Sequence, residues 1–243
     1  LDLIVIPTPN DTHFPLAKAA LAAGKHVVVD KPFTVTLSEA KQLKALAVDK
    51  ERLISVFHNR RWDSDFLTIQ ALLKEGTLGR MTGFESRFDR FRPEVRDRWR
   101  EKATPGGGIW YDLGPHLLDQ ACELFGMPSA ILLELGARRD GARADDDFLA
   151  LLEYDDRRVS LSAGTLVAEP TPRYRVHGTK GSYIKYGLDP QEDRLKAGET
   201  PSAAWGADGP GILTLREGEG EEAPLVRHDH PSLPGDYLAY YQG

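Results

Sequence analysis

Short apolar runs alternate with amphipathic segments along the first part of the chain. Residues 3–6, 27–29 and 53–57 are rich in β-branched and other apolar side chains, which is typical of strands covered on both faces. Between the first two runs, apolar side chains recur at helical spacing, with Thr12 as the expected cap and Gly24 as the stop. Thr-Leu-Ser-Glu at 36–39 is a capping box that predicts a second helix through about residue 49. This order of elements predicts parallel βαβ units in a doubly wound sheet.

The pattern changes after residue 60. We expect a helix over residues 63–75, a strand with one solvent-facing side over 82–91, and another helix over 112–125. Later strand-like runs lie at residues 130–137, 148–154, 159–165, 174–177, 183–186 and 212–216. Short polar links between several of these runs indicate hairpins. The sequence therefore predicts an α+β unit with a mostly antiparallel sheet.

Both ends of the sequence lie inside expected elements. Leu1 opens an apolar run, and the residues after Gly235 have the pattern of a helix start that Asp236 caps. Because chain ends are usually loose rather than buried in a strand, we expect a piece of a longer protein. The alternative is a genuine short protein with a frayed start.

Composition excludes several classes of protein. The 243 residues carry 31 basic and 37 acidic side chains, a net charge of −6, and no basic run, which argues against nucleic-acid binding. The single cysteine, Cys122, allows neither an internal disulfide nor a cysteine-rich zinc site. No apolar run approaches the ~20 residues of a membrane span, and no signal-peptide pattern is seen. We therefore expect a cytoplasmic protein with no membrane partner.

A glycine-rich segment carries the strongest chemical signal. Three consecutive glycines at 106–108 let the backbone approach another group closely. In a helix that begins near residue 111, Asp112, His116 and Asp119 share one face. A carboxylate beside an imidazole orients it and raises its proton affinity, as a general base requires. Two other interpretations are a surface His–Asp pair behind a glycine-rich helix entry, and two ligands of a metal site for which the sequence indicates no third.

Three further polar segments follow the three expected parallel strands. They are Thr-Pro-Asn-Asp-Thr-His at 8–13, Asp-Lys-Pro at 30–32 and His-Asn-Arg-Arg-Trp at 58–62. Taken singly, they are ordinary helix caps, a surface turn and an interdomain crossover with snorkelling arginines. Ligands bind outside the carboxyl ends of parallel strands, so one crevice would collect all three. A lysine held there can polarise an alcohol or carbonyl oxygen, and this convergence favours catalysis over a structural role.

The chain resembles the glucose–fructose oxidoreductase/inositol dehydrogenase (Gfo/Idh/MocA) family over essentially its whole length. The resemblance rests on Thr-Pro-Asn-x-x-His, Asp-Lys-Pro-Phe, Asn-Arg-Arg-Trp-Asp and Gly-Gly-Gly-x-x-x-Asp-x-Gly-x-His-x-x-Asp, in this order. The family's Glu-Lys-Pro is Asp-Lys-Pro here, which keeps the lysine. The resemblance implies an α/β fold in which residues 1–58 are the C-terminal part of a Rossmann dinucleotide-binding domain. Residues 59–235 would form an α+β domain for substrate and oligomerisation with a large, mostly antiparallel open sheet, and 236–243 the start of a truncated helix.

The resemblance also implies an NAD(P)-dependent oxidoreductase that transfers hydride between nicotinamide and a sugar, polyol or inositol-like alcohol. Lys31, Asp112 and His116 match the catalytic positions, with His116 as general base, Asp112 on a substrate hydroxyl and Lys31 polarising the substrate oxygen. Expected contacts of the cofactor, NAD or NADP, are Thr8, Pro9, Asn10, His13, Asp30, Lys31, Asn59 and Arg60. Weaker candidates for the substrate pocket are Arg87, Trp99 and Tyr111. The open sheet face implies a homodimer or homotetramer, and no metal is expected.

One feature of the family is missing from the sequence. None of the 23 glycines forms the Gly-x-Gly-x-x-Gly turn after an opening strand. At ~30 residues per βαβ unit, we expect roughly 60–70 residues upstream, including the residue that selects NAD or NADP, and poor dinucleotide binding by the chain as given. Two other functions share the fold. A non-catalytic dinucleotide- or sugar-sensing regulator would have little reason to keep all three catalytic residues, and the motifs do not exclude an NAD-assisted glycosidase.

Overall fold

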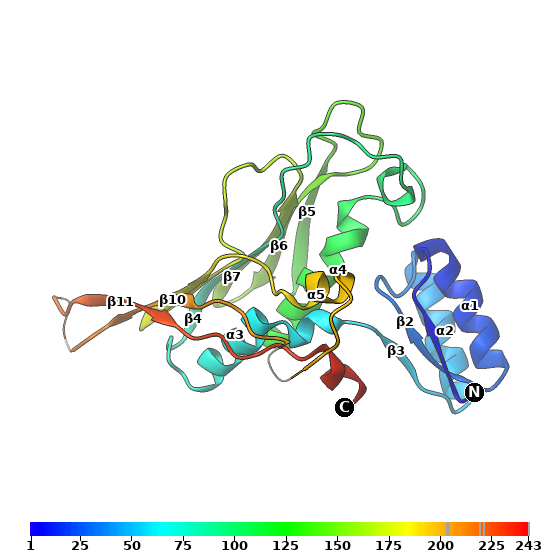
Figure 1. The fold of residues 1–243 in the computed structure, drawn as a ribbon, viewed down its shortest axis with the longest axis horizontal. Coiled ribbons are helices and arrows are strands. Elements are labelled where there is room, and N and C mark those ends of the chain that lie inside the picture. The colour runs from blue at the N-terminus through cyan, green and yellow to red at the C-terminus, as the bar shows by residue number, and fades with distance from the viewer. Residues whose placement is uncertain (203–204, 219, 221, 243) are drawn as a thin grey trace.

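The chain folds into two units that lie side by side (Figure 1). The computed structural model describes residues 1–202, 205–218, 220 and 222–242. The N-terminal unit is a small layered structure of strands and helices, and the larger unit is built on one long twisted sheet. The two-domain organisation expected from the sequence is therefore present, with the change of pattern near residue 60 falling between the units.

A parallel three-stranded sheet forms the N-terminal unit. Its strands, in spatial order, are β1 (Leu3–Ile6), β2 (His26–Val29) and β3 (Ile54–Val56), joined by α1 (Asn10–Ala22) and α2 (Leu37–Asp49). Alternate strand residues such as Ile6 and Val29 pack with Leu21 and Leu43 of the helices in one buried core. The predicted capping box is confirmed, since Thr36 Oγ1 accepts the backbone N–H of Glu39 at 3.2 Å.

The start of the first helix differs from the prediction. The sequence predicts Thr12 as its cap, but α1 begins at Asn10 directly after Pro9. Pro9 already has the extended backbone of a capping residue, with φ −59° and ψ 147°. Thr12 therefore falls in the first turn, where its hydroxyl donates to the Pro9 carbonyl oxygen at 2.6 Å. The predicted stop is confirmed, because Gly24 follows the helix with φ 73°.

The second unit contains an open eight-stranded sheet. Its strands are β4 (Met81–Arg87), β5 (Ala130–Gly136), β6 (Asp147–Tyr154), β7 (Arg157–Gly164), β8 (Tyr174–Gly178), β9 (Gly181–Lys185), β10 (Gly211–Arg216) and β11 (Leu225–His230). They lie in the order β11-β10-β9-β8-β4-β7-β6-β5, and only the β4–β7 pair is parallel. The large, mostly antiparallel open sheet is thus confirmed, although β11 and the parallel pairing were not predicted.

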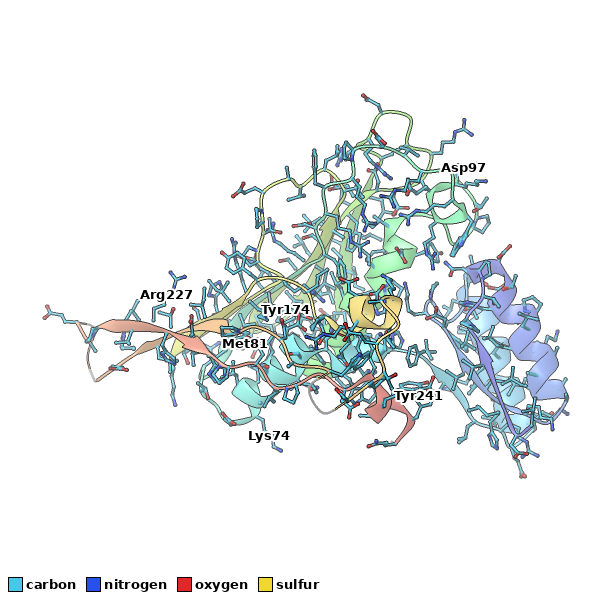
Figure 2. The ribbon with its side chains drawn as sticks, in the orientation of Figure 1. Lys74, Met81, Asp97, Tyr174, Arg227 and Tyr241 are labelled. Atoms are coloured by element: carbon cyan, nitrogen blue, oxygen red, sulfur yellow. The ribbon has the colours of Figure 1, made fainter. Side chains whose placement is uncertain are left out.

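Two helices cover one face of this sheet. They are α3 (Ser64–Lys74) and α4 (Ile109–Phe125), the latter starting three residues earlier than expected. The core between the layers includes Phe84, Leu117 and Tyr174, and Figure 2 shows Tyr174 in this interior. Shorter helical segments are η1 (Asn59–Trp62), η2 (Trp99–Glu101), α5 (Gln191–Lys196), which was not predicted, and η3 (Tyr237–Tyr241). As expected, Asp236 caps the last of these, since its Oδ1 accepts the N–H of Leu238 at 3.1 Å.

The opposite face of the sheet is left open by the described helices. Leu149 and Leu151 on β6 share this face, because they alternate with buried residues, and Leu132 on β5 joins them because it pairs with Leu151. All three leucines are exposed. The sheet therefore has one buried side and one uncovered side, which is apolar along β5 and β6 and charged at Glu85 and Arg87 of β4.

Candidate active site

A cavity of about 820 Å³ lies between the two units. The carboxyl ends of the parallel strands form one wall, and α4 together with the segment after β4 forms another. Described residues that line it include Ile6, Pro7, Val28, Asp30, Lys31, Asn59, Arg60, Arg90, Arg92, Arg100, Asp112, Leu113, His116, Glu192, Trp205, Tyr237 and Tyr241. Parallel strands direct their carboxyl ends to a single edge, so this is where the sequence predicts the ligand crevice.

Lys31 and Asp112 meet across this cavity. Lys31 follows β2 and Asp112 lies in the first turn of α4, and Lys31 Nζ donates to Asp112 Oδ1 at 3.0 Å and also to the Asp112 carbonyl oxygen. Arg100 Nε approaches the same carboxylate oxygen at 3.3 Å. Burial acts to raise the pKa of Asp112, but the Lys31 and Arg100 cations outweigh it and hold that pKa below its usual range. Asp112 is therefore an ionised acceptor held between two cations.

His116 lies one helical turn after Asp112 and is buried. Its Nδ1 has no hydrogen-bond partner among the described residues. Burial, followed by the positive charges of Lys31 and Arg60, lowers the pKa of His116 well below its ordinary value of 6.5. The imidazole is thus neutral near pH 7 and able to accept a proton. His116 is also one of the residues that line the cavity, so a neutral imidazole lies at its wall.

The carboxylate–imidazole pairing expected on α4 is not formed. Asp112 is held by Lys31 and Arg100, and the two oxygens of Asp119 accept from Arg61 Nε and Nη2 at 2.8 and 2.7 Å. Positions i and i+4 of a helix are near one another, but guanidinium and ammonium groups from other segments bind these carboxylates more strongly than a neutral ring does. Helical spacing alone therefore gave the wrong partners.

Asp119 has a second neighbour from the crossover. His58 Nε2 lies 3.7 Å from its Oδ1, and burial lowers the pKa of His58 in spite of this carboxylate. His58 follows β3, next to the cavity residue Asn59. The sequence indicated this segment, but it gave no signal that distinguished His58.

The glycine run lets α4 pack against two other segments. A Cβ at Gly106 would lie 3.1 Å from both Asn10 Cβ and Val35 Cγ2, so this residue brings the two units together. Gly108 has φ 92°, and a Cβ there would lie 1.9 Å from Asp145 Oδ1. Asp145 in turn accepts the N–H of Trp110 at 2.7 Å at the start of α4. The expected close backbone approach is present, and its partners are protein groups.

Four of the expected cofactor contacts line the cavity: Asp30, Lys31, Asn59 and Arg60. Asp30 Oδ1 accepts the N–H of Lys31 at 2.8 Å, while Asp30 Oδ2 and the Asn59 amide have no hydrogen-bond partner among the described residues. Arg60 is buried and paired with Asp63 and Glu192. Burial opposes the charged form, but these carboxylates raise the pKa of Arg60 above its usual range. Asp30 and Asn59 therefore have free polar atoms for a ligand, and Arg60 is already neutralised.

The remaining expected cofactor contacts lie around the start of α1 and are not among the described cavity-lining residues. Asn10 Nδ2 donates to the Gly106 carbonyl at 2.8 Å, and the Thr8 and Thr12 hydroxyls are 2.6 Å apart. Pro9 precedes the helix. His13 is fully buried, with Nδ1 2.8 Å from the Pro32 carbonyl oxygen and Nε2 2.8 Å from that of Thr8. His13 therefore ties together the loops that follow β1 and β2, where the Lys31–Pro32 peptide is cis.

The three weaker substrate candidates are also absent from the described cavity wall. Arg87 lies on the open face of the sheet, where Nη2 approaches Glu85 Oε2 at 3.5 Å. The Trp99 ring packs against the Arg100 guanidinium, and the Tyr111 hydroxyl donates to the Val35 carbonyl oxygen at 3.1 Å. The strand period explains Arg87, because adjacent strand residues point to opposite faces.

The segment after β4 contributes several arginines to the wall of the cavity. Arg90, Arg92 and Arg100 line the cavity, and the sequence interpretation missed all three. A signal was present, since the segment from 87 to 100 carries arginines at mostly alternating positions after a strand.

Among the residues described, no group of three His, Cys, Asp or Glu side chains is arranged to hold a metal ion. None of the helices in the described chain has the length and hydropathy to cross a bilayer.

The fold and the site together define a class of protein, and comparison with known proteins identifies the family within that class. Residues 1–58 match a model described as oxidoreductase family, NAD-binding Rossmann fold, and residues 66–184 match the Gfo/Idh/MocA C-terminal domain. The class is therefore that of NAD(P)-binding oxidoreductases, with a Rossmann unit followed by a sheet domain. The chain belongs to the Gfo/Idh/MocA family, which confirms the resemblance seen in its motifs.

Several relatives are similar over the whole chain. An uncharacterised oxidoreductase, YdgJ, of Escherichia coli is 62% identical over 99% of this chain and 69% of its own length. The scyllo-inositol 2-dehydrogenase (NADP(+)) IolW of Bacillus subtilis is 43% identical over 100% of this chain and 68% of its own length. A solved structure of a protein described as an oxidoreductase of Yersinia pestis has a TM-score of 0.92 and 61% identity, covering 100% of this chain and 68% of that one.

Proposed function

We propose that this protein transfers hydride between NAD or NADP and a hydroxyl-bearing carbon of a sugar, polyol or inositol-like alcohol. The observation that carries this proposal is the grouping of Lys31, Asp112 and a neutral, unpartnered His116 on one cavity. The family supplies the oxidoreductase class, and a relative named as an inositol dehydrogenase supports the choice of alcohol.

The residues around the cavity fit a nicotinamide ribose. Asp30 Oδ2 can accept from ribose hydroxyls, and the Asn59 amide can bind the carboxamide, since both lack partners among the described residues. The dinucleotide, when bound, supplies the hydride acceptor or donor. The further expected contacts, Thr8, Pro9, Asn10 and His13, would act mainly by holding the loops after β1 and β2 in place.

Three side chains serve the reaction by accepting the proton, stabilising the developing negative charge and positioning the groups involved. His116 takes the hydroxyl proton as the alcohol is oxidised, because its imidazole is neutral and lines the cavity. Lys31 donates to the reacting oxygen and stabilises the negative charge that develops there. Asp112 fixes the Lys31 ammonium at 3.0 Å and accepts from a substrate hydroxyl.

The test is turnover of free polyols and sugars by the full-length protein and by its His116→Ala variant. We expect NAD(P)H formation with at least one polyol, and a loss of about 10²-fold or more in kcat for the variant. An exposed histidine on β11 provides the control, His228→Ala, which should leave kcat unchanged. Unchanged turnover in His116→Ala would reject the base role. Release of a leaving group from an aryl glycoside without net NAD(P)H would instead identify a glycosidase.

We also propose that the open sheet face packs against a second copy of the chain in a homodimer or homotetramer. Leu132, Leu149 and Leu151 form an apolar group that the described helices leave uncovered. An exposed apolar patch rimmed by polar residues is typical of a protein–protein interface.

A further inference from the structure

The cavity carries an excess of positive charge that the protein as a whole does not. Of the described residues that line it, eight are lysine or arginine and three are aspartate or glutamate, a local excess of five (eight minus three). The complete chain has a net charge of −6. Walls of one sign concentrate ligands of the opposite sign, so this distribution favours an anionic ligand.

Two of the three carboxylates that line the cavity are already paired with cations. Asp112 is bound by Lys31 and Arg100, and Glu192 by Arg60 and Lys196. Asp30 accepts the backbone N–H that follows it. The positive excess is therefore not neutralised from within the cavity.

Three arginines of the cavity wall have no counter-ion among the described residues: the exposed Arg96 and the partly buried Arg90 and Arg92. The two partly buried arginines are the ones held at the cavity. Neither guanidinium has a carboxylate within ion-pair distance in the described part of the chain, and Arg90 packs against the Phe88 ring with its Cζ 4.8 Å from the centroid. Burial and repulsion by Arg92 lower the pKa of Arg90, as expected for a half-buried cation that lacks a counter-ion. Arg98, by contrast, is paired with Glu101 at 2.6 Å.

The backbone holds these two arginines toward the cavity. The N–H groups of Arg90 and Arg92 donate to the Gly164 and Thr165 carbonyls at 2.9 and 2.7 Å, so the segment continues as extended chain beside the end of β7. In such a chain, residues two apart point the same way, which places Phe91 on the other side, where it is exposed. The buried Arg139 donates from Nη1 to the carbonyls of Arg92 and Glu94 and fixes the segment further. Figure 2 labels Asp97 in the loop that follows.

We infer that the substrate carries an anionic group, a carboxylate or a phosphate, which Arg90 and Arg92 bind beside the reacting alcohol. This inference rests on the proposed oxidation of an alcohol at Lys31, Asp112 and His116. Two guanidinium groups held on one side of a chain match the geometry of carboxylate and phosphate oxygens. Arg90 is also close enough to Asp112 to help lower the pKa of that carboxyl group. The anionic group would therefore lie near the catalytic residues. The substrate class is thus a sugar acid or a sugar or inositol phosphate.

Direct binding tests this assignment without relying on turnover. The full-length protein, with and without NADPH, is titrated calorimetrically with D-glucuronate, inositol monophosphate, D-glucose and myo-inositol. We expect one anionic probe to bind at least about tenfold more tightly than its neutral counterpart. Arg90→Gln/Arg92→Gln should abolish that preference while leaving the weak affinity for the neutral probe unchanged. The control is Arg80→Gln, which removes the same charge from an exposed position outside the cavity and should keep the preference.

The remaining outcomes separate this inference from its alternatives. Equal affinity for neutral and anionic probes, or no measurable binding of either anion, overturns it. So does a variant that loses affinity for NADPH but keeps the preference, because the arginines would then serve the cofactor's phosphates. If Arg90→Gln perturbs folding, Arg92→Gln alone, at a side chain with no partner in the described structure, should still weaken anion binding. NAD(P)H formation from none of the alcohols, with the binding preference intact, would refute the proposed function alone.

Discussion

Lys31 and Asp112 are 81 positions apart in the sequence, yet Lys31 Nζ lies 3.0 Å from Asp112 Oδ1 across the gap between the two units. The lysine follows a parallel strand, and the aspartate lies in the first turn of the helix that carries His116. This contact fixes the ammonium beside the proposed base, and it depends on the docking of one unit against the other.

Replacing this lysine should remove the stabilisation of charge at the reacting oxygen. We expect Lys31→Met to lower kcat by about 10²–10³-fold, because a preorganised donor to a developing oxyanion contributes at that level. The measurement is the initial rate of NAD(P)H formation with a polyol substrate. Lys41→Met, at an exposed position of α2, is the matched control and should retain the parent rate. A Lys31→Met protein as active as the parent would contradict the assigned role.

The pH dependence of activity should reflect the environment of His116. Burial and nearby cations lower the pKa of His116 well below 6.5, and a general base works only when it is unprotonated. Activity should therefore persist as pH falls through 6.5 and decline only at lower values, where the folded-state imidazole takes up a proton. The check is a profile of kcat/KM against pH. An acidic limb centred at or above 6.5 would show that His116 is not the group that titrates.

The glycine turn before α4 should be sensitive to a single methyl group. Gly108→Ala would place Cβ 1.9 Å from Asp145 Oδ1 in a residue whose φ is 92°, so we expect the free energy of unfolding to fall by about 2–4 kcal/mol. Gly141→Ala is the control, since Gly141 also has a positive φ, 75°, but nothing lies within 4 Å of its Cβ position. It should cost about 1 kcal/mol. Urea unfolding of both variants measures the difference, and equal losses would mean that the Asp145 contact does not matter.

A buried carboxyl group of α3 should make stability depend on pH. Asp65 is fully buried, its Oδ2 has no hydrogen-bond partner in the described structure, and burial raises its pKa from 3.8 to about 6. A group with a raised folded-state pKa contributes stability that is present below pH 3.8 and is lost as the pH rises through 6. Asp65→Asn should therefore reduce the loss of unfolding free energy between these pH values by up to about 3 kcal/mol.

Denaturant unfolding over this pH range measures the effect of Asp65. The exposed Asp49→Asn on α2 should leave the pH dependence as it is in the parent. If Asp65→Asn has the same pH profile as the parent, the carboxyl group titrates identically in the folded and unfolded chains.

The open sheet face should control assembly. We expect Leu151→Arg to convert a homodimer or homotetramer into smaller species. Burying a charge in an apolar interface removes it from water, and this desolvation costs free energy that the interface does not return. Sedimentation velocity at several protein concentrations measures the mass. Leu37→Arg, at an exposed leucine of the other unit, should leave the mass unchanged. A parent protein that is already monomeric would remove the basis for this interface.

Local signals predicted much of the fold. The apolar runs of the first unit, the capping box at Thr36 and the alternation along β6 each reflect a periodicity that is local in the chain, so they could be interpreted without tertiary information. Elements with weak local signals were missed. The strand β11 carries four charged or imidazole side chains among Leu225–His230, and it pairs only at the sheet edge, beside β10.

The sequence by itself determined the family and the oxidoreductase class, through the motifs around Lys31, Asp112 and His116, the residues proposed for the chemistry. Only the tertiary structure decided their partners. Asp112 binds Lys31 and Arg100 rather than His116, Asp119 binds Arg61, and Arg90 and Arg92 rather than Arg87 face the cavity. The reason is physical: helical and strand periods place side chains on a face, but the strongest nearby charge selects the partner. In this chain that charge comes from segments distant in sequence.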